Sequence, residues 1–150
     1  MSNAGTLPLA ITMRVRDACL CLHVQRAARA LARRFDDAFR ALGLTNGQFS
    51  LLMSLNRPEP ARIAEVAALL AMDRTTLTAA LKPLARRKLV DVTVDPADKR
   101  GRRLTLTRAG HALLRRAVPI WNREHAAIER LVARLDANPD RLRAGLRVLG

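Results

Sequence analysis

The sequence predicts a mainly α-helical fold of the α+β class, in which a single β-hairpin accompanies several helices. Two observations support this prediction. Apolar residues recur at spacings of three and four through most of the 150 residues, the period of an amphipathic helix. Only residues 90–94 and 104–107 alternate between apolar and polar side chains, as half-buried strands do. A hydrophobic fraction of 49% is enough for the core of one domain.

From the sequence we predict a disordered or tag-derived N-terminus over residues 1–12, followed by a single domain over residues 13–150. Within this domain, an apolar stripe predicts a long amphipathic helix over residues 17–42, and Gly43 ends it. Thr45 and Gln48 have the spacing of a capping box, which predicts that a new helix begins there.

A proline-rich break over residues 57–60 separates that helix from a short one over 62–70. Asp73 is then expected to cap a helix that runs over residues 74–89. This helix has a leucine face for the core, while its opposite face carries hydroxyl groups and cations. Pro83 lies inside it, which removes one backbone hydrogen bond and is expected to bend the helix.

The C-terminal part begins with the hairpin, whose strands are residues 90–94 and 104–106 and whose loop is DPADKRGRR. Val90, Val92 and Val94 are expected to share one face of the first strand. Thr107 should cap a long helix that kinks at Pro119. The pair Asn138-Pro139 predicts an N-cap, with proline at the first helical position of a terminal helix.

Charge indicates the class of partner. The net charge is +14 and the sequence pI is about 11.7, which points first to nucleic acid and second to an anionic membrane surface. No apolar run is long enough to span a membrane, and the N-terminus lacks the layout of a signal peptide. With three phenylalanines, one tryptophan and no tyrosine, the chain could hardly stack single-stranded bases, so duplex DNA is the better expectation.

Two successive helices followed by a hairpin are the order of a winged helix-turn-helix, which we predict over residues 45–107. The polar face of the second helix suits the DNA major groove, and an arginine of the hairpin tip suits the minor groove. We also expect Asp98 to orient a neighbouring arginine so that Arg100 is presented. The predicted DNA-binding residues are Arg74, Thr75, Thr76, Thr78, Lys82, Arg86, Lys99, Arg100, Arg102 and Arg103.

These residues resemble the MarR family of bacterial transcriptional regulators. Asp98-Lys99-Arg100, followed by Leu104-Thr105-Leu106-Thr107 and Gly110, is similar to that family's most specific signature. Residues 43–52 and 81–90 and the pair Pro119 and Trp121 are also similar to family patterns. The sequence departs from them at Ala79-Ala80, where the family often has arginine and a polar residue, and at Lys88, where it has glycine.

The resemblance implies a cytoplasmic, nucleoid-associated homodimer, joined by helices in residues 13–42 and 108–150, that binds a pseudo-palindromic operator. It further implies a repressor that is released by a small aromatic or phenolic effector. The effector cleft would lie between the dimer helices and the DNA-binding lobe. The candidates for its lining are Arg16, His23, Phe49 and Met53.

Two alternatives stay open. Cys19 and Cys21 could form a redox switch, although two residues apart on one helix they point about 200° from each other. Alternatively, the protein could be an architectural DNA-binding protein that recognises charge alone. We expect no enzyme activity, metal site or cofactor, because the three histidines lack ligand spacing and no catalytic constellation appears.

Overall fold

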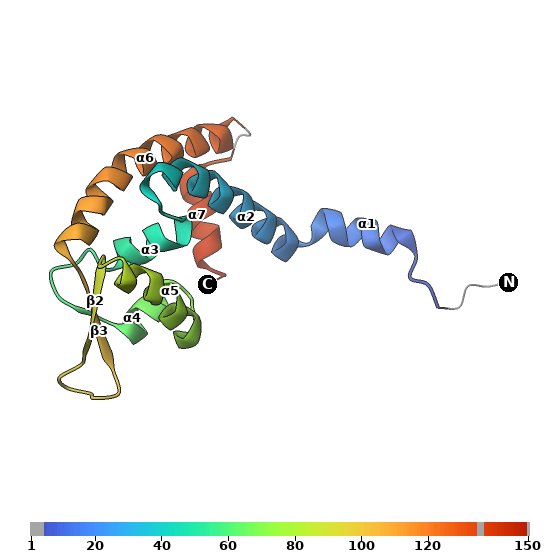
Figure 1. Cartoon of the computed structure of the whole chain (residues 1–150). Coiled ribbons are helices and arrows are strands. Elements are labelled where there is room, and N and C mark those ends of the chain that lie inside the picture. Colours follow the sequence, from blue (N-terminus) through green and yellow to red (C-terminus); the bar gives the residue numbers. More distant parts are fainter. Residues whose placement is uncertain (1–4, 135–136, 150) are drawn as a thin grey trace.

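The structure, a computed structural model, describes residues 5–134 and 137–149. It has two regions, a helical region and a lobe that ends in the hairpin (Figure 1). The helical region comprises α1 (Leu9–Ala18), α2 (Leu20–Phe39), the 3-10 turn η1 (Arg40–Leu42), α6 (Arg108–Ala133) and α7 (Pro139–Arg147). The lobe comprises α3 (Asn46–Ser54), β1 (Ala61–Arg62), α4 (Ile63–Leu69), α5 (Arg74–Arg86), β2 (Val90–Val94) and β3 (Arg102–Leu106).

The helix caps that the sequence predicts are confirmed. Thr45 Oγ1 accepts the Gln48 N–H at 3.2 Å, and Gln48 Oε1 accepts the Thr45 N–H at 3.1 Å. Asp73 accepts the Thr76 N–H at the start of α5. Thr107 caps α6 and Asn138 caps α7. Each cap satisfies backbone N–H groups that the first turn of a helix leaves without partners.

The first long helix begins earlier than predicted and is interrupted. Residues 9–12, which we expected to be disordered or tag-derived, form the start of α1, whereas residues 1–4 lie outside the described part of the chain. Cys19 leaves the helical conformation, with φ −72° and ψ 103°, and separates α1 from α2. The ring of His23 contacts the Asp17 carbonyl oxygen across the break at 3.1 Å. This contact replaces a backbone hydrogen bond that a continuous helix would make.

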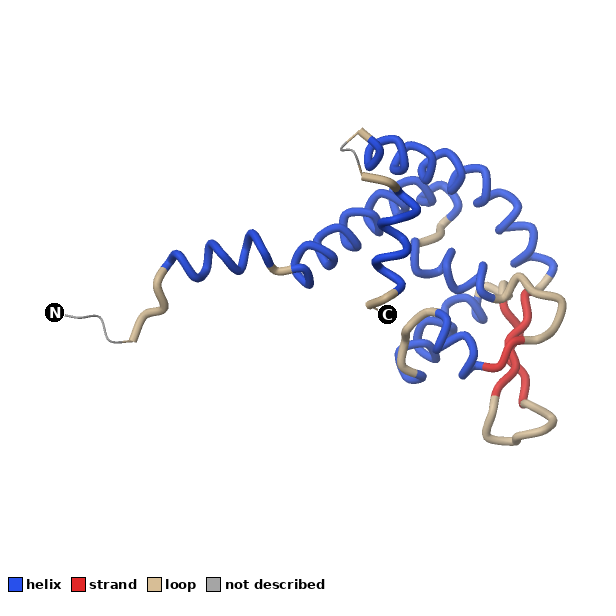
Figure 2. Tube along the Cα trace, turned by 180° about the vertical axis from the view of Figure 1, so that it is seen from behind, coloured by secondary structure: helices blue, strands red, loops and turns tan. Residues whose placement is uncertain are grey.

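The sheet has three strands where we predicted two. The strand order is β1-β3-β2, all antiparallel, and Leu104 of β3 lies opposite both Ala61 and Val92. Leu104 and Leu106 are buried as predicted, and the predicted strand with Val90, Val92 and Val94 on one face is confirmed. Val90 is buried, but Val92 and Val94 are exposed. The hairpin protrudes beyond the helices that cover its base (Figure 2).

The core joins the two regions. Phe39 at the end of α2 is fully buried, and its ring lies 5.8 Å from that of Phe35 and 4.8 Å from that of Phe49 in α3. In the helical region, Arg34 of α2 pairs with Glu124 of α6 at 3.0 Å. The lobe contributes its own fully buried leucines, among them Leu52, Leu77, Leu84 and Leu104.

A second connection ties α5, the helix predicted to enter the DNA major groove and called the recognition helix below, to the end of η1. Arg87 follows α5 directly, and its Nη1 donates to the Gly43 carbonyl oxygen at 2.7 Å. Its Nη2 lies 3.5 Å from the Leu42 carbonyl oxygen. Gly43 itself has φ +62°, the left-handed conformation predicted for the residue that ends this helix. The end of α5 is therefore bonded to the carbonyl groups where η1 ends.

Lys88 occupies a strained position, because its φ is +55° and it is not glycine. We expect Lys88→Gly to raise the free energy of unfolding by about 1 kcal/mol, since the left-handed conformation penalises a Cβ and only part of the gain is offset by unfolded-state entropy. Urea unfolding measures this change. Lys88→Ala is the matched control, because it removes the charge and keeps the Cβ. An equal gain in both variants would contradict the strain explanation.

Candidate nucleic-acid interface

The polar face of α5 is exposed along its length. Arg74, Thr75, Lys82 and Arg86 all face solvent, on the side opposite the buried Leu77, Leu81 and Leu84. Two of the predicted contact residues are already engaged within the helix. Thr76 Oγ1 donates to Asp73 Oδ2 at 2.6 Å, and Thr78 Oγ1 donates to the Arg74 carbonyl oxygen at 2.7 Å.

The Thr76 hydroxyl therefore completes the N-cap of α5. It also holds the pKa of Asp73 below its usual range, together with the Thr76 backbone N–H. The exposed cations of the helix make no ion pair with a carboxylate in the described part of the chain. They form a basic face that is free to bind an anion.

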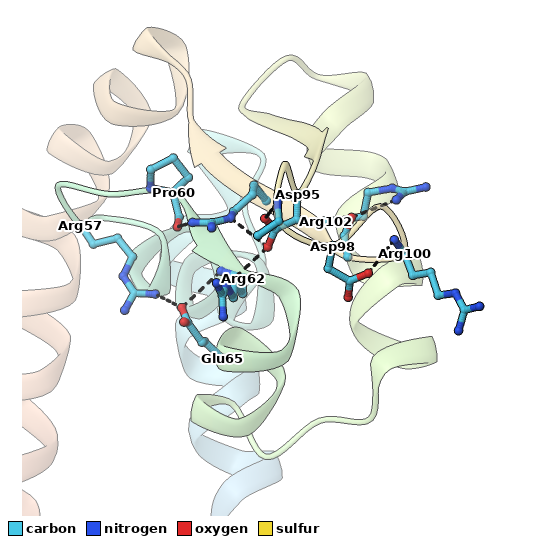
Figure 3. A network of polar contacts seen from close by, with 11 residues as sticks. Arg57, Pro60, Arg62, Glu65, Asp95, Asp98, Arg100 and Arg102 are labelled. Atoms are coloured by element: carbon cyan, nitrogen blue, oxygen red, sulfur yellow. Dashed lines mark hydrogen bonds and ion pairs between the residues drawn. The ribbon is translucent and has the colours of Figure 1, made fainter.

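The hairpin tip carries the second basic group. Asp98 Oδ1 accepts the Arg100 backbone N–H at 3.0 Å, so the Arg100 side chain extends outward from the loop (Figure 3). Arg102 donates to the carbonyl oxygens of Lys99 and Gly101 at 3.3 and 3.0 Å. These bonds fix the loop backbone and leave Lys99 and Arg100 exposed.

The expectation for Asp98 is corrected by these contacts: it holds the loop backbone and forms no ion pair with an arginine among the described residues. The ion-paired aspartate is Asp95, which is 3% exposed. Its Oδ2 lies 3.1 Å from Arg103 Nε and 3.4 Å from Arg62 Nε, while its Oδ1 accepts the Ala97 N–H (Figure 3). The Ala97 N–H and then the Arg103 guanidinium hold the pKa of Asp95 below its usual range.

Arg103 therefore differs from the other hairpin arginines. Its side chain is 25% exposed and faces Asp95, and its Nη1 lies 3.5 Å from the Pro60 carbonyl oxygen. Arg103 Nε is buried without an aligned hydrogen bond, so its contact with Asp95 is mainly Coulombic. The alternation of β3 places Arg103 on the face opposite Leu104 and Leu106, so its burial could not be predicted from the sequence: it depends on Asp95 and on Arg62 of β1, which pairs with Arg103.

Next to this cluster, Arg57 and Glu65 connect the loop before β1 with α4. Glu65 accepts the Arg62 backbone N–H at 3.2 Å and the Arg57 guanidinium at 3.0 Å (Figure 3). These contacts, the Arg62 backbone N–H first, hold the pKa of Glu65 below its usual range. Arg57, Arg62 and Asp95 were not among the site residues predicted from the sequence.

The two basic groups meet across the lobe. A small cavity of about 190 Å³ lies between α5 and the hairpin, and its polar lining includes Thr78 and Lys82 of α5 and Arg102 of β3. Leu81, Ala85 and Val92 form its apolar floor. α5 and the hairpin therefore line the same cavity, which the order of elements alone could not establish.

An apolar cavity of about 470 Å³ lies between the lobe and α6. Phe49 and Met53, two of the four predicted effector residues, line it together with Trp121. The other two predicted residues lie elsewhere: Arg16 pairs with Asp17 on α1, and His23 lies at the helix break. Leu69, Leu70 and Val118, which were not predicted from the sequence, complete the apolar lining.

The cysteines lie at the break between α1 and α2. Cys19 is half-buried between the two helices and Cys21 is exposed on α2, where its sulfur accepts a hydrogen bond from Gln25 at 3.3 Å. The predicted arrangement on one continuous helix is therefore wrong, while the redox role stays a prediction. Within the ranges 5–134 and 137–149, no cluster of three metal-ligating residues occurs, and no helix is long and apolar enough to cross a membrane.

Comparisons with known proteins agree with this geometry. A sequence model of the MarR family matches residues 42–101. The transcriptional regulator MosR of M. tuberculosis, solved in complex with DNA, is 37% identical, with a TM-score of 0.78 over 87% of this chain and 92% of MosR. The chain belongs to the MarR family.

Two further relatives are repressors. CouR, a transcriptional repressor solved on a 23-mer DNA duplex, is 27% identical, with a TM-score of 0.78 over 97% of this chain and 99% of CouR. The repressor NicR of Pseudomonas putida is 36% identical over 76 residues, which are 51% of this chain and 48% of NicR. The match to NicR therefore spans about half of that protein. MarR-family proteins of this kind are DNA-binding transcriptional regulators, and the winged helix-turn-helix fold is confirmed.

Proposed function

We propose that this MarR-family protein is a dimeric transcriptional repressor that binds a pseudo-palindromic operator in double-stranded DNA. The observation that carries the proposal is that the exposed cations of α5 and those of the hairpin lie on the two sides of one cavity, which Lys82 lines from α5 and Arg102 from β3. α5 would enter the major groove, and Arg100 would reach the adjacent minor groove. The protein would act in the cytoplasm by binding alone, with no catalytic step.

Exposed apolar side chains support the dimer. Leu20 and Leu31 on α2 and Leu142 and Leu146 on α7 are each at least 41% exposed. The helical region therefore presents apolar surface that a single chain leaves uncovered. A two-fold dimer would cover these leucines and place two recognition helices about 34 Å apart, one turn of B-DNA.

Footprinting on the DNA that flanks the protein's own gene tests the proposal. We expect a dyad-symmetric footprint that persists as salt is raised, because base contacts are less sensitive to salt than phosphate contacts. An architectural protein would instead protect DNA without a preferred site and lose binding steeply with salt. The second result would replace the regulator with the architectural alternative.

Arg100→Ala should lower operator affinity about tenfold, since Arg100 extends freely from the wing and would lose its groove contact. Fluorescence anisotropy with a labelled operator measures the effect, and size-exclusion chromatography checks the oligomeric state. Arg134→Ala is the matched control, because it removes the same charge just beyond the end of α6, far from the wing (Figure 1). Equal affinities of the two variants would remove the wing from the proposed interface.

The apolar cavity between the lobe and α6 supports the effector part of the proposal. Its volume of about 470 Å³ and its lining by Phe49, Met53 and Trp121 suit a small aromatic molecule. Because the cavity adjoins both the lobe and α6, an occupant would change the spacing of the recognition helices. Titration of the operator complex with phenols and aromatic acids should release DNA for a member of that class. Unchanged affinity across such a panel would reject the effector and leave DNA binding intact.

A further inference from the structure

A cavity with a charged lining lies at the base of the wing, on the side of α4. It has a volume of about 480 Å³ and is lined by the first residues of α4, by the start of α5 and by the hairpin loop. Its charged lining consists of Arg62, Arg74, Arg100, Arg102, Asp95 and Asp98. Three separate segments contribute these side chains. The four arginines and two aspartates give the lining an excess of positive charge.

The two aspartates of this cavity have partners of their own. Asp95 is paired with Arg103 and accepts the Ala97 N–H, and Asp98 accepts the Arg100 backbone N–H. The side chains of Arg74, Arg100 and Arg102 make no ion pair with a carboxylate among the described residues. The guanidinium groups are therefore not neutralised inside the lobe, and the cavity favours an anion with several acceptor oxygens.

Arg62 is the residue that could turn towards such an anion. It is the more distant partner of Asp95, at 3.4 Å against 3.1 Å for Arg103, and its side chain is 55% exposed against 25%. If Arg62 left Asp95, Arg103 would still neutralise the carboxylate. Arg103 has no such freedom, because it packs beneath the loop and contacts the Pro60 carbonyl oxygen.

We propose that this cavity seats a phosphate of the DNA backbone and that Arg62 binds this phosphate directly. The proposal rests on the proposed function and adds a contact residue outside the recognition helix and the wing. The phosphate would lie where the backbone passes between the start of α5 and the hairpin loop. Arg62 would then fix the position of the lobe on the duplex without reading sequence.

The salt dependence of binding tests this assignment. We expect Arg62→Ala to weaken binding about fivefold at low salt and to reduce the slope of log K against log salt by about 0.9, the value for one lost phosphate contact. Binding to the operator and to a scrambled duplex of equal length should weaken by the same factor. Arg62→Lys should retain the slope, because it keeps the positive charge.

Arg57→Ala is the matched control, since Arg57 also pairs with a carboxylate in this part of the lobe but does not line the cavity proposed to seat the phosphate. The slope of log K against log salt for Arg57→Ala should equal that of the wild type. An unchanged slope in Arg62→Ala, or a loss confined to the operator, would overturn the assignment. A wild-type protein without a preferred site would instead overturn the proposed function, so the two failures are distinguishable.

Discussion

Replacement of Gly110 by alanine is expected to lower the free energy of unfolding by about 3 kcal/mol. A Cβ at this position would lie 2.2 Å from the Leu89 carbonyl oxygen and 3.1 Å from Leu106 Cδ2. The nearest atom belongs to the backbone, so it cannot rotate away as a flexible side chain would. α6 would have to move away from the base of the wing. Urea unfolding followed by circular dichroism measures the loss.

Gly145→Ala in α7 is the matched control. Among the described residues, no atom outside the local backbone of α7 and the chain neighbours of Gly145 lies within 4 Å of the position that its Cβ would occupy, so alanine should stabilise the helix by about 0.5–1 kcal/mol. Both substitutions replace glycine by alanine, but they should change the free energy of unfolding in opposite directions. A Gly110→Ala protein with the wild-type urea midpoint would show that α6 does not pack against Leu89 at this distance.

Asp95→Asn is expected to lower Tm at pH 7 by about 5 °C. The amide can still accept the Ala97 N–H, but Arg103 and Arg62 lose the carboxylate that neutralises them. Arg103 would then be a poorly solvated cation beneath the hairpin loop. Asp98→Asn is the matched control, because Asp98 accepts only a backbone N–H that an asparagine also accepts. Equal Tm values for the two variants would contradict the role of Asp95.

The pH dependence of stability is a second test of the role of Asp95. The pKa of Asp95 is lowered in the folded protein. Its stabilising contribution is therefore complete above the unfolded-state pKa, near 4, and is lost as the pH falls through the folded-state pKa. The difference in stability between wild type and Asp95→Asn should be constant between about pH 5 and 7 and should shrink below about pH 4. A difference independent of pH would mean that the charge of Asp95 is not involved.

Features set by neighbouring residues could be predicted from the sequence. The caps at Thr45, Asp73, Thr107 and Asn138 depend on side chains within three residues of the N–H groups that they bind. The left-handed Gly43 and the hairpin strands are local in the same sense. Such interactions depend on residues that are close in sequence, so residue type and spacing are enough to predict them.

Features set by distant residues could not be predicted in this way. The choice between Asp95 and Asp98 depends on β1, a two-residue strand that pairs with β3 and brings Arg62 to the hairpin. The break at Cys19 has no proline or glycine to mark it. Phe49 and Met53 line the apolar cavity, and the residues of α6 that line it with them could not be identified without the fold.

The contact between Arg87 and the residue after η1 links α5 to the chain that follows α2. Arg87 Nη1 donates to the Gly43 carbonyl oxygen at 2.7 Å. We expect that a change in the angle between the α2 helices of a dimer would be transmitted through this contact to the distance between the two α5 helices. The energetic coupling is reciprocal. An operator that holds the recognition helices at one spacing would also hold the α2 helices at one angle.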